Sequence, residues 1–163
     1  MNTPLLEVND LRKVFVDRDF ETPVLKGVNF TLQRSEMVAM LGPSGSGKST
    51  LLSILGTLMR PTAGSFRMLG RELTSLKEAE LSDFRNQQIG FIFQSFHLAP
   101  RLTAFENVEL PMVLAAIPPA ERRKRAEAVL ASLNLTDRAH HRPDQLSGGQ
   151  RQRVAIARAM VME

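Results

Sequence analysis

The chain has 163 residues, of which 43% are hydrophobic and 23% are charged, and its formal net charge is +4. This length fits one domain with its own core, and the composition excludes collagen-like, disordered and disulfide-stabilised classes. Because there is no cysteine, a thiolate metal site and a cysteine nucleophile are excluded. No apolar run approaches the roughly 18 residues that cross a bilayer. The N-terminus has no secretory-signal pattern.

The first part of the chain predicts strands that lead into a glycine-rich turn. Alternating apolar and polar residues indicate strands over residues 6–16 and 24–32. The continuous apolar run 37–41 predicts a buried strand of a parallel sheet. After the turn at 42–47, residues 48–58 carry the wide apolar stripe that is typical of a helix.

The rest of the chain continues this alternation. In chain order we expect a strand over 65–69, a helix over 76–84, a buried strand over 89–93, and helices over 103–116 with an interruption at Pro111, over 120–133 and over 147–162. Strands that alternate with helices favour an α/β fold class.

Residues 42–49 match the phosphate-loop pattern G-x-x-x-x-G-K-[ST]. Glycines let successive backbone N–H groups curl around an anion, and the following helix N-terminus adds its dipole. Lys48 would supply a charge for the β- and γ-phosphates, and Ser49 a hydroxyl for Mg²⁺. An ordinary glycine-serine turn is the alternative. The predicted ATP-binding residues here are Gly42, Pro43, Ser44, Gly45, Ser46, Gly47, Lys48, Ser49 and Thr50.

A second glycine motif opens the last predicted helix. Ser147 is a good N-cap, and Gly148 and Gly149 leave the backbone around it bare. This arrangement would make a second anion-binding helix terminus, although a plain capped turn is the commoner meaning of such a sequence.

The two glycine motifs, with Gln94 ending a strand between them, resemble the nucleotide-binding domain of ABC-type ATPases. Residues 89–108 are most similar to the subgroup of macrolide-exporter and lipoprotein-releasing ATPases. The resemblance implies a P-loop NTPase core with an antiparallel β subdomain and an α-helical signature subdomain. It implies one such domain over residues 1–163, with core and β subdomain in 1–95 and at the chain end, and the helical subdomain at about 96–150.

The resemblance also implies roles for single residues. Phe15 would stack on adenine, with a plain core position as the alternative. Gln94, like Ser49, would contact the Mg²⁺, and it would sense a membrane partner. The signature residues would reach the γ-phosphate of an ATP held by a second copy; they are Leu146, Ser147, Gly148, Gly149 and Gln150.

The implied cofactors are ATP and Mg²⁺. The implied partners are a second nucleotide-binding domain in a head-to-tail dimer and a transmembrane permease, without nucleic acid. The implied function is that of the ATP-binding subunit of an ABC transporter, which couples ATP binding and hydrolysis to substrate export or lipoprotein extraction. The chain would then be cytoplasmic, and peripheral at the inner face of the cell membrane through the permease.

The acidic residues that hydrolysis requires in this family have no counterpart here. In the family, an apolar strand ending in Asp, a catalytic Glu and a histidine near the γ-phosphate follow the signature helix, and none can be placed in these 163 residues. We therefore assign no catalytic residue and expect ATP binding at most. We also expect missing C-terminal strands, an exposed apolar face on residues 37–41 and marginal stability. A cooperative thermal transition together with steady ATP turnover would contradict this.

Two other functions stay open from the sequence. An ABC-type DNA-repair or chromosome ATPase would insert long heptad coiled coils between the glycine motifs, and no sustained heptads occur there. An inert nucleotide-binding regulatory fragment is the other. The basic run 121–125 favours a solvated helix face over a nucleic-acid or lipid-headgroup patch, and residues 140–141 favour a surface loop over a metal pair.

Overall fold

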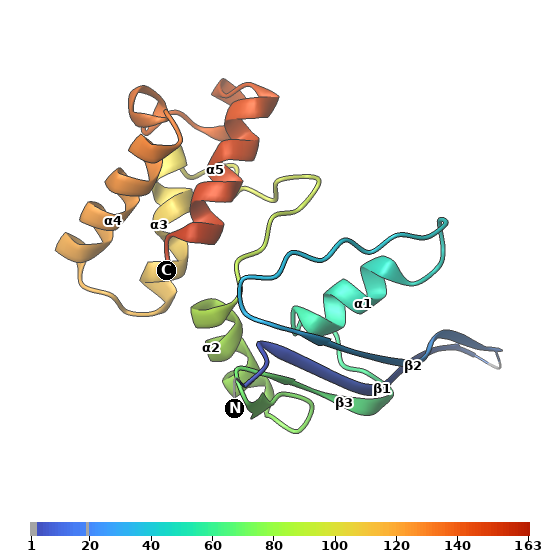
Figure 1. Cartoon of the computed structure of the whole chain (residues 1–163). Helices are drawn as coiled ribbons and strands as arrows, with labels where there is room; N and C mark the ends of the chain where they lie inside the picture. The colour runs from blue at the N-terminus through green and yellow to red at the C-terminus, as the bar shows by residue number, and fades with distance from the viewer. Residues whose placement is uncertain (1–2, 19) are drawn as a thin grey trace. The chain divides into compact units, whose positions relative to one another are not determined.

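The structure is a computed structural model that describes residues 3–18 and 20–163. The chain divides into two compact units, Met1–Ser82 and Asp83–Glu163 (Figure 1). The elements in chain order are β1 (Leu6–Asp17), β2 (Phe20–Leu32), α1 (Lys48–Leu55), β3 (Ala63–Met68), β4 (Arg71–Glu72), α2 (Glu78–Gln88), α3 (Ala104–Leu114), α4 (Pro119–Ser132), two 3₁₀ turns (Thr136–Arg138 and Pro143–Gln145) and α5 (Gly148–Met160).

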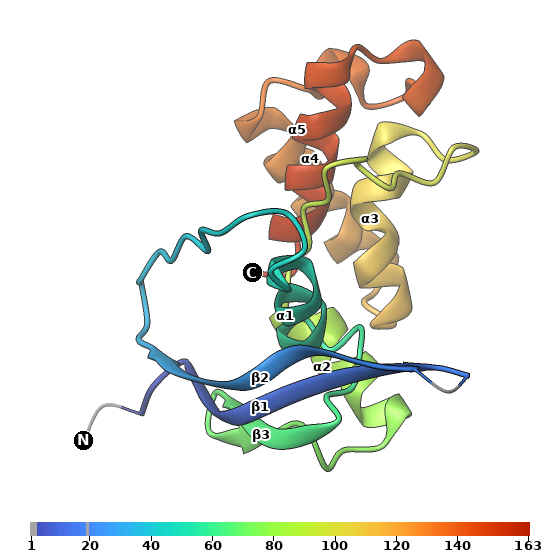
Figure 2. The same cartoon turned by 90° about the vertical axis from the view of Figure 1, so that its right-hand side faces the viewer.

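The first unit is a small antiparallel sheet with a helix over it. The strand order is β2-β1-β3-β4, with β1 paired to both long neighbours. Side chains of a strand alternate between the two faces, so one face can be apolar. Leu11, Ile54 and Phe66 are buried in the core. Figure 2 shows α1 over one face of the sheet, and its buried residues are Leu51, Ile54 and Leu55.

The second unit is a helical layer built from α3, α4 and α5. Its core is the buried apolar cluster that includes Val108, Met112, Leu130 and Val154. Inside it lies one polar side chain, Asn107, which is fully buried. A buried carboxamide needs partners, and Asn107 accepts from the Ala99 N–H at 2.7 Å and donates to the carbonyls of Ala99, Leu102 and Thr103. These bonds fasten the loop before α3 to the core.

Most predicted elements are confirmed within a few residues at their ends. The strands expected over 6–16, 24–32 and 65–69 are β1, β2 and β3. The five expected helices are α1 to α5, although α1 stops at Leu55 because Gly56 caps it and Thr57 has a positive φ. The α/β fold class is confirmed. In the described part of the chain, every helix is too short or too polar to cross a bilayer.

Two predicted strands are wrong. Residues 37–41 and 89–93 are irregular, and the sheet of the described chain is antiparallel throughout rather than parallel. An apolar run becomes a strand only when another strand bonds to it, and among the described residues none pairs with either run. Met37 is 98% exposed and Leu41 92% exposed. This exposure agrees with the expected apolar face on residues 37–41.

The predicted interruption at Pro111 is also wrong. α3 continues through Pro111 to Leu114. A proline inside a helix removes one backbone donor, but Met112 beside it is fully buried and ties this turn to the core. The Pro111 carbonyl is itself used, because it accepts from Ala115 N–H at 3.0 Å and from the Asn86 side chain at 3.0 Å.

Candidate functional site

The loop before α1 depends on a left-handed glycine. Gly47 is the N-cap of α1 with φ +89°, a conformation that an L side chain adopts only with strain. A Cβ at this position would lie 3.0 Å from Val24 Cγ1 and 3.3 Å from the Val24 carbonyl oxygen. The chain therefore needs glycine here both for its dihedral angle and for its close approach to β2.

The first turn of α1 is left open by this cap. A helix starts with four N–H groups that have no partner in the helix, and Gly47 provides no side-chain acceptor for them. The helical ladder begins with Leu51 N–H donating to the Gly47 carbonyl at 2.8 Å. The earlier N–H groups thus face outward from the helix end, where an anion gains from both the donors and the dipole.

Lys48 folds back over the same loop. Its Nζ donates to the Gly42 carbonyl at 2.8 Å and to the Pro43 carbonyl at 2.7 Å, with Ser46 Oγ at 3.4 Å. Ser49 is exposed at the start of α1. The loop therefore gathers an ammonium group, a hydroxyl and unfilled backbone donors within a few residues. This donor set fits a phosphate group and leaves a hydroxyl for its counter-ion.

Phe15 also belongs to the first unit. It lies on β1 opposite Thr22 and is 40% exposed, so it is not a core residue. Lys13 Nζ stands 5.2 Å from the centre of its ring. Half-exposed aromatic rings can stack on a planar ligand, and the role of Phe15 at adenine stays a prediction.

The second glycine motif, in the other unit, starts α5 with a side-chain cap. Ser147 Oγ accepts from Gln150 N–H at 3.2 Å, while the Gln150 side chain accepts from Ser147 N–H at 2.8 Å, a complete capping box. Leu146 before the cap is buried in the core. A Cβ on Gly148 or Gly149 would meet no atom within 4 Å. The helix start is thus anchored on one side and open on the other.

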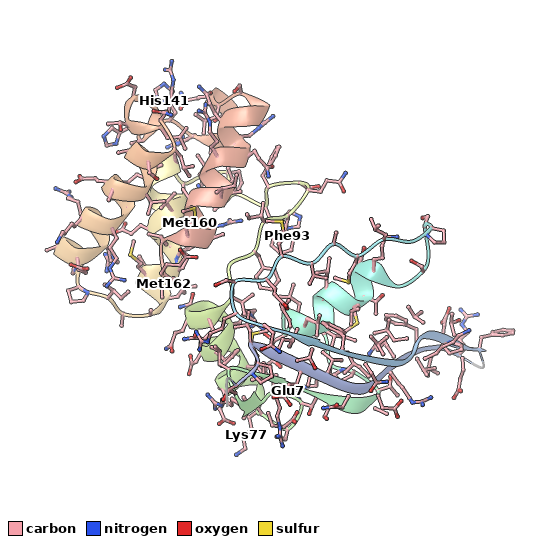
Figure 3. All side chains as sticks on the ribbon, viewed as in Figure 1. Glu7, Lys77, Phe93, His141, Met160 and Met162 are labelled. Atoms are coloured by element: carbon pink, nitrogen blue, oxygen red, sulfur yellow. The ribbon has the colours of Figure 1, made fainter. Side chains whose placement is uncertain are left out.

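Gln94 lies in the second unit as well, on an irregular segment rather than at the end of a strand. It is exposed in a tight turn that Phe96 N–H closes by donating to the Phe93 carbonyl at 3.1 Å. Figure 3 labels Phe93 on this segment between α2 and α3. Arg158 of α5 donates to the carbonyls of this turn. No sequence motif singles out Arg158, although its spacing of seven from Arg151 predicts that both lie on one face of the helix.

The predicted site residues therefore fall into two groups. The first unit holds Phe15 and residues 42–50, and the second holds Gln94 and residues 146–150. Over the part of the chain that the structure describes, no group of three or more His, Cys, Asp or Glu is placed to hold a metal ion. A magnesium ion at Ser49 would depend on phosphate oxygens for most of its ligands.

Known proteins are similar to this chain in sequence and in fold. The pattern of the family described as "ABC transporter" matches residues 25–163. The chain is 50% identical over 158 residues to the macrolide export ATP-binding/permease protein MacB of Marinobacter nauticus, covering 97% of this chain and 24% of that protein. It is 51% identical over 156 residues to an uncharacterized ABC transporter ATP-binding protein of Thermotoga maritima, covering 96% of this chain and 67% of that protein.

A third relative is the pyoverdine export ATP-binding/permease protein PvdT of Pseudomonas entomophila, 49% identical over 162 residues, or 99% of this chain and 25% of that protein. Among solved structures, a dimeric ATP-binding cassette in a post-hydrolysis state with ADP and Pi matches with a TM-score of 0.87 and 44% identity. The match covers 96% of this chain and 69% of that one.

The chain spans about a quarter of the length of the curated ATP-binding/permease relatives and about two thirds of the separate ATP-binding proteins. The family pattern covers most of the chain. The identities near one half and the structural match agree with it. The chain belongs to the ABC transporter family.

Proposed function

We propose that this chain is the ATP-binding part of an ABC export system and that it binds ATP through the loop at residues 42–50. The observation that carries the proposal is the open first turn of α1, where Gly47 provides no cap and Lys48 lies across the loop. ATP supplies a polyphosphate chain whose charge these donors would neutralise. Lys48 would exchange its carbonyl contacts for phosphate oxygens, and Ser49 would hold the phosphate-bound Mg²⁺.

The remaining roles are parts of the same proposal. Phe15 would stack on the adenine, and Gln94 would contact the Mg²⁺ region. The exposed N–H groups of Gly148 and Gly149, with Ser147, would close on an ATP bound by a second copy in a head-to-tail dimer. Relatives named as ATP-binding/permease proteins support a permease partner, and with it a place at the inner face of the cell membrane. We assign no residue of these 163 as a catalytic acid or base.

The decisive experiment replaces Lys48. Lys48→Ala should weaken Mg·ATP binding on the order of 100-fold, because a charge-assisted hydrogen-bonding group is lost. Isothermal titration of ATP into the wild-type and variant chains measures this change. Lys77→Ala removes an exposed lysine of the same unit and should bind as the wild type does. Equal affinity for Lys48→Ala and Lys77→Ala would rule out the phosphate-loop assignment.

The dimer is tested separately. Sedimentation velocity of the chain with and without Mg·ATP should show nucleotide-dependent association. The association should be lost in Lys48→Ala. Association that does not depend on nucleotide would contradict ATP-mediated closure while leaving ATP binding by the monomer in place.

A further inference from the structure

The segment that carries Gln94 lies against α5 at more than one point. Near its start, Gly90 passes the end of α5 so closely that a Cβ there would lie 2.4 Å from the Ala159 carbonyl oxygen. Near its end, Arg158 donates from Nη1 to the His97 carbonyl at 2.6 Å and from Nη2 to the Phe96 carbonyl at 2.9 Å. Gln94 lies between these two points of attachment.

The backbone at the second point is strained. Phe96 has φ +60° and His97 has φ +47°, so two consecutive residues with side chains are left-handed. Such residues persist only where their surroundings hold them. Side-chain contacts add here to the backbone hydrogen bonds of the turn. The Arg158 guanidinium donates to both carbonyls, and the centres of the Phe93 and His97 rings lie 4.6 Å apart.

A second arginine of α5 reaches the same turn. The Arg151 guanidinium lies 5.6 Å from the centre of the Phe96 ring, within the range of a cation–π contact. Arg151 and Arg158 are seven residues apart, which places them on one face of the helix. Arg151 directly follows the signature residues, so this face of α5 joins the start of the helix to the Gln94 turn.

An arginine side chain can donate to both carbonyl oxygens of this turn at once. A guanidinium is planar and presents several N–H donors in fixed directions, whereas a lysine ammonium is a single point charge. Burial of Arg158 lowers its pKa below the ordinary value, because the cation loses part of its hydration. The side chain nevertheless keeps its charge, because an arginine is not deprotonated in proteins.

We propose that Arg158 is a positioning residue, which holds the Phe96–His97 turn on α5 so that the Gln94 segment and the signature helix move as one body. The hold itself depends only on contacts within the second unit. Its consequence for nucleotide rests on the proposed function, in which Gln94 and Ser147 both act at ATP. A displacement of the signature helix is then passed directly to Gln94.

Amide hydrogen exchange without nucleotide tests the hold. Arg158→Met removes both donors at similar length and should raise exchange at residues 94–98 at least tenfold, with α3 and α4 unchanged. Arg158→Lys should fall between wild type and Arg158→Met. The matched control is Arg153→Met, which removes an arginine of the same helix that donates to the Leu133 carbonyl at 3.3 Å. It should leave residues 94–98 as they are.

Two results would overturn the hold. One is unchanged exchange at 94–98 in Arg158→Met, and the other is an equal increase in Arg153→Met. If Arg158→Met does not fold, Arg158→Lys decides alone, because wild-type exchange at 94–98 in that variant contradicts the proposal and a local increase supports it.

A double-mutant cycle tests the consequence for nucleotide. Gln94→Ala and Arg158→Met should each weaken Mg·ATP binding, and the pair together should weaken it no more than Gln94→Ala alone. Additive losses would show that Arg158 does not act through Gln94. The failure of the proposed function is distinguishable, because it appears as ATP binding that Lys48→Ala leaves intact, whereas the exchange experiment involves no nucleotide.

Discussion

The N-termini of α1 and α5 are both entered through glycines, yet they satisfy their first turns differently. α1 has Gly47 as its cap and no side-chain acceptor, so its first N–H groups wait for an outside partner. α5 has a complete capping box and a buried leucine in front of it. The first start leaves its N–H groups available to an outside acceptor, whereas the second satisfies part of its first turn with its own side chains. Two glycine-rich sequences before a helix can therefore give different helix starts, one without a side-chain cap and one with a complete capping box.

The largest expected loss of stability comes from removing the buried leucine that precedes α5. Leu146→Ala removes a buried side chain from the core of the second unit and should lower the free energy of unfolding by about 2–5 kcal/mol. Urea denaturation followed by circular dichroism measures the loss. Leu114→Ala is the control, since this leucine is 73% exposed and its loss should change stability by less than about 0.5 kcal/mol. Equal losses would show that α5 is not anchored by Leu146.

Replacing glycine by alanine should lower the stability of the protein at the start of α1 and raise it at the start of α5. Gly47→Ala forces a side chain into a left-handed conformation and against Val24, which should cost more than the roughly 1–2 kcal/mol of the dihedral angle alone. Gly45→Ala, also left-handed at φ +81° but without a neighbour within 4 Å, should cost only that strain.

At the start of α5, replacing glycine by alanine should instead increase the stability of the folded chain. Gly148→Ala and Gly149→Ala meet no atom and keep helical dihedrals, so each should stabilise the chain by about 0.4–1 kcal/mol through the unfolded state. Thermal unfolding of the four variants compares them directly. A loss of stability at Gly148 or Gly149 equal to that at Gly47 would abolish the distinction between the two starts.

A smaller effect is expected from the cap of α5. Ser147→Ala removes the acceptor of the Gln150 N–H and should cost about 1 kcal/mol, while Ser147→Asp restores an acceptor and most of the stability. Ser44→Ala changes an exposed serine of the glycine-rich loop at residues 42–47 and should leave stability in urea denaturation unchanged. If Ser44→Ala costs as much as Ser147→Ala, the side-chain cap adds nothing to α5.

The smallest effect concerns pH and uses the start of α3 as a reference. There Thr103 and Glu106 form the same capping box with a titratable partner, and hydrogen bonds from the Thr103 N–H and hydroxyl lower the pKa of Glu106. Because the pKa of Glu106 is lower in the folded state than in the unfolded state, ionised Glu106 stabilises the fold. This contribution is fully present above the unfolded pKa near 4.5 and is lost as the pH falls through the folded pKa.

Because Glu106 is exposed, the change should be roughly a few tenths of a kcal/mol. Glu106→Gln should remove it, so that wild type and variant converge in stability at low pH. The capping box of α5 contains no titratable residue. Gln150→Glu should therefore add a pH-dependent contribution to the stability of α5. Stability curves against pH that stay parallel for wild type and Glu106→Gln would contradict the assignment.

The helices and the strands of the hairpin could be predicted from the sequence because the patterns that indicate them lie within short segments of the chain. The cap at Ser147 and the alternation of apolar and polar residues in β1 and β2 each lie within a few consecutive residues. The runs 37–41 and 89–93 were misjudged because a strand depends on a neighbour that the run itself does not specify. Arg158 was missed for a similar reason, since its partners at Phe96 and His97 lie about sixty residues earlier in the chain.

An exposed apolar run, residues 37–41, leads into the glycine-rich loop at residues 42–47. No charged residue lies between Glu36 and Lys48. Met37, Val38 and Leu41 are exposed, and no strand of the described chain pairs with this run. Extended, uncharged, apolar segments of this kind pair readily with another chain. In a purified preparation we expect this run, more than any other part of the two units, to set the protein concentration at which the chain begins to aggregate.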